Sequence, residues 1–87
     1  MILQYLRSFK TDYRRLPREI QSQVDRAIVL LHRNPGHPSL QVKKIRGTKD
    51  VWAGRVTRAY RFTFDWEGNV TTFRRVGTHA ILKKETR

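Results

Sequence analysis

Aromatic and polar side chains alternate over seven consecutive residues, and this alternation constrains the fold more strongly than any other feature of the sequence. The aromatic members are Tyr60, Phe62, Phe64 and Trp66, and the polar members between them are Arg61, Thr63 and Asp65. Because successive side chains of a β-strand point to opposite faces of a sheet, the pattern predicts a strand over 60–66. Its aromatic face should be buried in a core, and Arg61 should lie on the opposite, polar face.

Neighbouring segments predict the other strands of the sheet. Glu67-Gly68-Asn69 supplies a turn, after which the chain returns as a strand over 70–76. Further strands are expected at 2–6, 41–45 and 51–57. Pairing across a turn at Glu67-Gly68, or one residue later, places Arg61 and Arg74 on the same face. Arg55, near the end of the strand over 51–57, is a candidate third member of this basic cluster.

The first part of the chain has a helical period instead. Apolar residues recur there at spacings of three and four and form one stripe, which consists of Ile20, Val24, Ala27, Ile28 and Leu31. Pro17 suits the first position of this helix, and Asn34-Pro35-Gly36 ends it. Before it, Ser8 can cap a shorter helix that runs through Tyr13 and Leu16.

Together these patterns predict an α+β fold, in which two N-terminal helices pack on one face of a small, mainly antiparallel sheet. The aromatic face of the strand over 60–66 should meet the apolar stripe of the second helix. A chain of 87 residues has room for one domain, spanning 1–87, with a single modest core.

Charge is the most unusual part of the composition. Nineteen Lys and Arg residues stand against seven Asp and Glu residues, which gives a net charge of +12. Such a chain attracts phosphate backbones or acidic proteins, and composition alone does not separate the two. No apolar run approaches the roughly 20 residues of a membrane-spanning helix, so no membrane association is expected.

The residues that could bind metals or cofactors are few. The absence of cysteine excludes disulfides, cysteine-based zinc sites and thiol catalysis, and it fits a reducing cytoplasm. His32 and His37 have no carboxylate pattern around them, and no glycine-rich loop that could hold a phosphate is present. We therefore expect neither a metal nor another cofactor.

Short motifs in a fixed order carry a resemblance to a known family. From the N-terminus they are Ser8-Phe9-Lys10, Leu16-Pro17, Ile45-Arg46-Gly47, Trp52-Ala53-Gly54-Arg55-Val56, Tyr60-Arg61-Phe62 and Gly77-Thr78-His79. In order and spacing they resemble the RelE/ParE superfamily of toxins from bacterial type II toxin–antitoxin systems, particularly the RelE, YoeB, HigB and YafQ branches. The resemblance covers nearly the whole chain and implies a RelE-like fold.

The resemblance implies a ribosome-dependent endoribonuclease that cuts mRNA without a metal, by attack of a 2′-oxygen on the neighbouring phosphate. It assigns the catalytic arginine to Arg61, a second phosphate-binding residue to Arg55 and a general acid or base to His79. These residue types suit the reaction, because imidazole titrates near neutrality and guanidinium groups carry a permanent charge. Two departures are visible: Ala80 follows the histidine where YoeB has a tyrosine, and Lys43 stands nearest to the position of a carboxylate in some branches.

Further basic residues are candidates for binding RNA, namely Lys43, Lys44, Arg74, Arg75 and Lys83. The implied partners are an acidic antitoxin, in a hetero-oligomer with this chain, and the ribosome with its mRNA. One alternative is a toxin like those of the ParE branch, which inhibits DNA gyrase and is not a nuclease. Another is a plain nucleic-acid-binding module, although the alternation places the aromatic rings in the core instead of on an exposed stacking platform.

Overall fold

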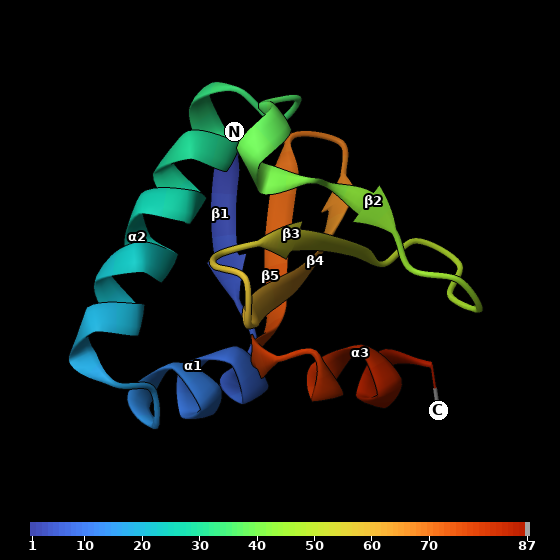
Figure 1. Cartoon of the computed structure of the whole chain (residues 1–87). Coiled ribbons are helices and arrows are strands. Elements are labelled where there is room, and N and C mark those ends of the chain that lie inside the picture. The colour runs from blue at the N-terminus through green and yellow to red at the C-terminus, as the bar shows by residue number, and fades with distance from the viewer. Residues whose placement is uncertain (87) are drawn as a thin grey trace.

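The computed structural model describes residues 1–86, which form helices on both sides of a five-stranded sheet (Figure 1). The helices are α1 (Arg7–Arg14), α2 (Arg18–Arg33), the short 3-10 helix η1 (Pro38–Leu40) and α3 (Ala80–Glu85). The strands are β1 (Ile2–Tyr5), β2 (Lys43–Lys44), β3 (Trp52–Arg55), β4 (Tyr60–Glu67) and β5 (Val70–Thr78).

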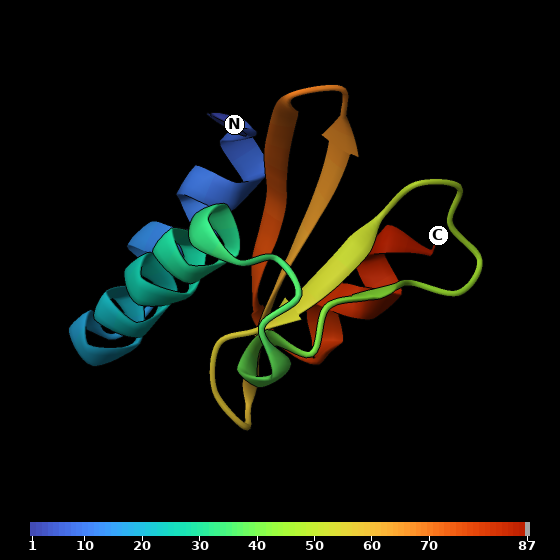
Figure 2. The same ribbon diagram turned by 90° about the horizontal axis from the view of Figure 1, so that it is seen from above.

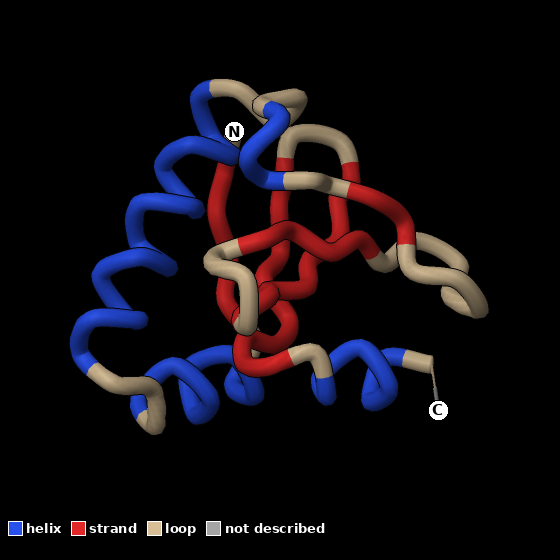
Figure 3. The backbone as a smooth tube through the Cα atoms, in the orientation of Figure 1, coloured by secondary structure: helices blue, strands red, loops and turns tan. Residues whose placement is uncertain are grey.

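The strands lie in the order β1-β5-β4-β3-β2. Figure 3 shows the strands in red and the helices in blue. Only the pair of β1 and β5 is parallel among the paired strands of residues 1–86, so the predicted α+β fold with a mainly antiparallel sheet is confirmed. The turn between β4 and β5 also lies where it was expected, since Glu67 pairs with Val70 and leaves Gly68 and Asn69 as the loop. Gly68 has φ +59°, a conformation that glycine adopts without steric cost.

Two boundaries at the helices differ from the prediction. Ser8 does not cap α1, because the helix begins at Arg7 and the Ser8 hydroxyl donates to the carbonyl oxygen of Arg74 at 2.6 Å. Pro17 is the residue before α2 instead of its first residue. The predicted strand over 41–45 shortens to the two residues of β2, and the one over 51–57 shortens to the four residues of β3.

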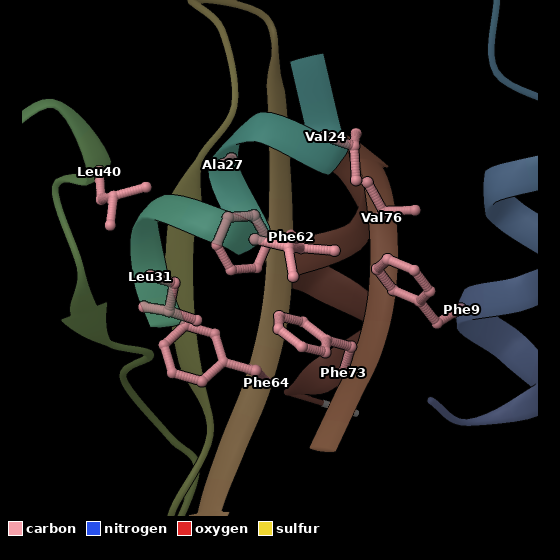
Figure 4. Packing of buried hydrophobic residues seen from close by; sticks show 10 residues of the cluster. Phe9, Val24, Ala27, Leu31, Leu40, Phe62, Phe64, Phe73 and Val76 are labelled. Carbon is pink, nitrogen blue, oxygen red and sulfur yellow. The ribbon is translucent and has the colours of Figure 1, made fainter. Parts of the chain in front are cut away.

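The core lies between the sheet and the two N-terminal helices, as the aromatic alternation predicted (Figure 4). Ten buried residues form one cluster, and the largest of them are the fully buried rings of Phe62, Phe64 and Phe73. Residues of the α2 stripe, such as Val24 and Leu31, pack against these rings. Burying a side chain of this size contributes about 1.5–3 kcal/mol, so this cluster is the main source of stability.

Gly54 on β3 leaves room for the ring of Phe62 in the core. Gly54 pairs with Phe62, and a Cβ atom at Gly54 would come within 2.3 Å of a carbon of the Phe62 ring. Only a residue without a side chain therefore fits between β3 and this part of the core.

A β-bulge in β5 allows both Phe73 and Val76 to face the core, although they are three residues apart. The ladder pairs Thr63 with Arg75 but Phe64 with Phe73, so Arg74 is one extra residue on β5. Strict alternation after Phe73 would turn Arg75 into the core and Val76 away from it. With the bulge, Val76 is 1% exposed and belongs to the core cluster, while Arg75 stays outside.

The second face of the sheet is not open along its whole length, which corrects the prediction. The short helix α3, which the sequence patterns did not predict, lies on the side of the sheet opposite to α1 and α2 (Figure 2). On this face Ala53 and Thr63 of the sheet are buried, and so is Ile81 of α3. A Cβ atom on Gly77 would lie 3.0 Å from the Ile81 side chain, so α3 approaches β5 closely. No helix within residues 1–86 is long and apolar enough to cross a membrane.

Candidate active site

Two arginines face each other on the polar side of the sheet. Arg55, the last residue of β3, pairs directly with Arg61 near the start of β4, so both side chains leave the same face. Partial burial lowers the pKa of Arg61 from its ordinary value, and the nearby charge of Arg55 lowers it further. The guanidinium still stays charged at neutral pH, because arginine does not lose its proton in proteins. This pair of close positive charges is the centre of the predicted basic cluster.

The guanidinium of Arg61 is held by the loop between β3 and β4. Its Nη1 donates to the carbonyl oxygens of Thr57, Arg58 and Tyr60, the last at 2.9 Å. Within residues 1–86 no acceptor is bonded to Nε or Nη2 of Arg61. One side of the guanidinium is therefore fixed by backbone carbonyls, while two donors on the other side remain available to an anion.

His79 lies at the same end of the sheet. The β4–β5 ladder ends with the pair Tyr60–Thr78, and His79 follows directly as the residue that begins the turn into α3. Its side chain is exposed and makes no capping hydrogen bond to α3. Because Arg61 pairs with Gly77, two residues earlier, the imidazole starts from a backbone position close to the arginine pair. The structure thus brings Arg55, Arg61 and His79 to one corner of the sheet.

The five RNA-binding candidates occupy different places. Lys43 pairs with Ala53 on the edge strand β2 and shares a face with Arg55, two residues further along β3. Lys44 pairs with Trp52 and therefore belongs to the opposite face. Lys83 is exposed on α3.

Arg74 and Arg75 are paired with carboxylates. Arg75 donates to Asp12 through Nε at 2.8 Å and Nη2 at 3.0 Å, and the same carboxylate accepts from the backbone N–H of Val76 at 3.2 Å. This two-point contact joins α1 to β5 beyond the end of β1. Arg74 donates to Glu85 through Nε at 3.1 Å and lies 3.5 Å from Asp65. Arg74 does share the polar face of the sheet, as expected, but its charge is compensated.

Glu85 is a structural residue of this face that the sequence analysis did not single out. Its side chain is 5% exposed, and besides the contact with Arg74 it accepts a 2.6 Å hydrogen bond from the hydroxyl of Thr63. The carboxylate fastens the C-terminal end of α3 to β4 and β5, while His79 stands at the other end of the same helix. No sequence signal marks this contact, because Glu85 is the sole acidic residue in a short basic segment, 79–87.

The corner of the sheet can bind and stabilise a phosphate that gains negative charge, and it can exchange a proton through an imidazole. Fixed guanidinium donors favour a charged transition state most when they do not have to reorganise. Across residues 1–86, no three side chains of the His, Asp or Glu type gather as ligands for a metal ion.

Comparisons with known proteins identify the fold. No protein-family model matches the chain, and no curated protein matches it by sequence. YafQ from E. coli strain BL21(DE3) superimposes with a TM-score of 0.78 at 18% identity, over 92% of this chain and 94% of YafQ. A YoeB/ParE toxin from Agrobacterium tumefaciens gives 0.75 at 20% identity, over 91% and 99% of the two chains.

An antitoxin–toxin complex, RelB–RelE from Methanococcus jannaschii, also has this fold in one of its chains. Its TM-score is 0.74 at 21% identity, and the match covers 93% of this chain and 95% of that one. At such identities the likeness establishes the architecture. The chain thus has the fold of the RelE, YoeB and YafQ toxins, as the resemblance of its motifs predicted.

Proposed function

We propose that this protein is the toxin of a type II toxin–antitoxin system and an endoribonuclease that cleaves mRNA on the ribosome. The observation that carries the proposal is the arginine pair Arg55–Arg61 beside His79. The fold shared with RelE, YoeB and YafQ toxins supports it, as does the net charge of +12, which suits a surface of ribosomal and messenger RNA.

The proposed reaction is an internal transfer at one phosphate of the RNA. The ribose 2′-oxygen attacks phosphorus, the bond from phosphorus to the 5′-oxygen breaks, and a 2′,3′-cyclic phosphate and a 5′-hydroxyl remain. One proton leaves the 2′-hydroxyl and one reaches the 5′-oxygen. His79 serves as the acid or the base in these transfers, and water exchanges the other proton. No redox step or metal is needed for this balance.

The arginines stabilise the charge that develops on the phosphate. Nε and Nη2 of Arg61 can donate to two oxygens of the same phosphate, because the loop carbonyls hold the opposite side of the guanidinium. Arg55 adds a second positive charge from the facing position of β3. Lys43 lies on the same face and can contact a neighbouring phosphate. In this proposal Arg74 and Arg75 maintain the structure, since both are already paired with carboxylates.

The proposed partner is an acidic antitoxin that forms a hetero-oligomer with this chain. Antitoxin–toxin complexes occur among the proteins with this fold, and RelB–RelE is one of them. A chain of charge +12 should attract an acidic partner over a long distance, and such attraction mainly raises the rate of association.

Gyrase inhibition on the same fold remains the second candidate, because a fold does not determine its function. The specific observation that keeps it is the departure at Ala80, where YoeB-like toxins have a tyrosine. The corner with Arg61 and His79 has no evident use in a gyrase inhibitor.

The test compares cleavage of mRNA on programmed ribosomes with supercoiling by gyrase. The wild-type protein should cut the mRNA and leave cyclic phosphate ends, and it should not affect gyrase. Arg61→Ala should lose at least about 10³-fold in the single-turnover rate, since it removes the fixed donors. Arg18→Ala, an exposed charge at the start of α2, is the matched control. Inhibition of gyrase with intact mRNA would refute the nuclease, and equal cleavage by Arg61→Ala would remove Arg61 from the site.

A further inference from the structure

A second basic site adjoins the arginine pair on the side of α2. A cavity of about 220 Å³ lies between α2, η1 and the end of β3, lined by Gln23, Arg26, Ala27, Leu30, Ser39, Leu40, Arg55 and Val56. Its apolar members are buried or half-buried, whereas Gln23, Arg26 and Ser39 are exposed. The cavity therefore combines an apolar floor with a polar rim.

The charge of this cavity is positive and uncompensated. Its lining contains two arginines and no carboxylate. Among residues 1–86, neither Arg26 nor Arg55 forms an ion pair, in contrast to Arg74 and Arg75. The amide of Gln23 and the hydroxyl of Ser39 add neutral hydrogen-bonding groups to the rim.

We propose that this cavity binds one nucleotide of the single-stranded RNA next to the scissile phosphate. Its phosphate lies between Arg26 and Arg55, and its ribose contacts the apolar floor. The inference rests on the proposed function and names a binding site for that substrate. Arg55 connects the two sites, because it is the last residue of β3, lines the cavity and pairs with Arg61 on the neighbouring strand. A strand that reaches the arginine pair can thus continue past β3 toward α2.

The size of the cavity fits this ligand. The cavity has a volume of about 220 Å³ and is open to solvent on one side, so it has room for a ribose phosphate whose chain continues outside it. An acidic protein segment would also meet two arginines here. The apolar floor beneath the charges and the direct link to Arg61 favour the nucleotide, and the experiment treats an acidic segment as a refuting outcome.

The test measures binding of short single-stranded RNAs whose 2′-positions are methylated, so that they cannot be cleaved. We expect Arg26→Gln to weaken binding of a four-nucleotide RNA about five- to tenfold and to leave binding of a dinucleotide unchanged. The slope of log Kd against log salt should fall by about 0.7, the value for one lost phosphate contact on a single strand. Arg18→Gln, which removes the same charge from the same helix outside the cavity, should change the affinity less than twofold.

Three results separate this site from the proposed function. Equal binding by Arg26→Gln and Arg18→Gln would overturn the nucleotide site, even if the wild-type protein cleaves mRNA. Weaker binding of an acidic antitoxin, with unchanged RNA binding in Arg26→Gln, would overturn it as well. Wild-type protein that binds the four-nucleotide RNA through Arg26 but cleaves no mRNA would support the site and refute the nuclease. If cleavage occurs, Arg26→Gln should raise KM about five- to tenfold and leave kcat within twofold.

Discussion

The two faces of the sheet are built on different principles. On the side of α1 and α2, ten buried residues among those described form one aromatic and aliphatic cluster, in which the rings of Phe62, Phe64 and Phe73 are the largest side chains. On the side of α3, Ala53 and Ile81 are the only buried apolar residues within 1–86, and the helix is fastened by the Glu85 carboxylate. The first face supplies most of the stability, whereas the second holds charged groups in defined positions.

This difference separates stability from chemistry within a small chain. Arg55 and Arg61 lie on the α3 side, but their strands are fixed by the rings on the other side, since Phe62 directly follows Arg61. Side-chain changes among the charged residues should therefore affect activity more than folding. Changes on the ring side should have the opposite effect.

The largest effect is expected from Gly54→Ala on the ring side. The new Cβ would meet carbons of the Phe62 ring at 2.3–2.9 Å, and because this ring is fully buried, any shift that relieves the contact must also displace its neighbours in the core. Overpacking typically costs about 1–3 kcal/mol, and we expect at least the upper end of this range. Chemical denaturation should show the loss in the free energy of unfolding.

Gly36→Ala is the matched control for that change. Gly36 lies in an exposed turn, its φ is not positive, and the nearest atom to an added Cβ is 3.8 Å away. The substitution should leave stability unchanged or raise it by up to about 1 kcal/mol through the unfolded chain. If Gly54→Ala were as stable as Gly36→Ala, the two faces would not differ in the way described.

The sequence predicted the ring side well because burial leaves a periodic pattern. The alternation over 60–66 and the stripe from Ile20 to Leu31 identified the strand, the helix and the contact between them. The bulge at Arg74 was not predicted, because alternation assumes regular pairing. The helix α3 was missed for a related reason: six residues with one buried side chain, Ile81, are too few to give a period.

The candidate site was proposed mainly from motifs. Strand pairing predicted that Arg61 shares a face with Arg74 and left Arg55 as a candidate third member, while the motif Gly77-Thr78-His79 marked the histidine. What the sequence could not indicate was which arginines were already compensated, because Asp12 lies 63 positions before Arg75. Contacts between distant residues follow from the fold and not from spacing.

An intermediate effect is expected from His79→Gln, at the junction between β5 and α3. The glutamine keeps polar contacts but cannot exchange a proton near neutral pH, so the rate of mRNA cleavage should fall about 10²-fold. The free energy of unfolding should change by less than about 0.5 kcal/mol, because the side chain is exposed. His32→Gln, an exposed histidine in the last turn of α2, should change neither quantity. A threefold or smaller loss in His79→Gln would assign the proton transfers to other groups.

The smallest effect is expected from Glu85→Gln, which tests whether the α3 side depends on its carboxylate. The amide is nearly isosteric and can still accept from Thr63, but it no longer compensates the charge of Arg74. Hydrogen bonds to charged groups contribute about 1.5–3 kcal/mol, and a third of the Arg74 side chain is exposed, so we expect a loss near 1 kcal/mol in the free energy of unfolding.

Amide exchange in Glu85→Gln should accelerate in α3 and not in α2, because α3 has few other contacts. Since His79 stands at the other end of this helix, the cleavage rate should fall less than about tenfold, with KM unchanged. Glu67→Gln, at the exposed end of β4, removes the same charge and should alter none of these quantities. Equal exchange rates of α3 in the two variants would show that Ile81, and not the carboxylate, holds the helix on the sheet.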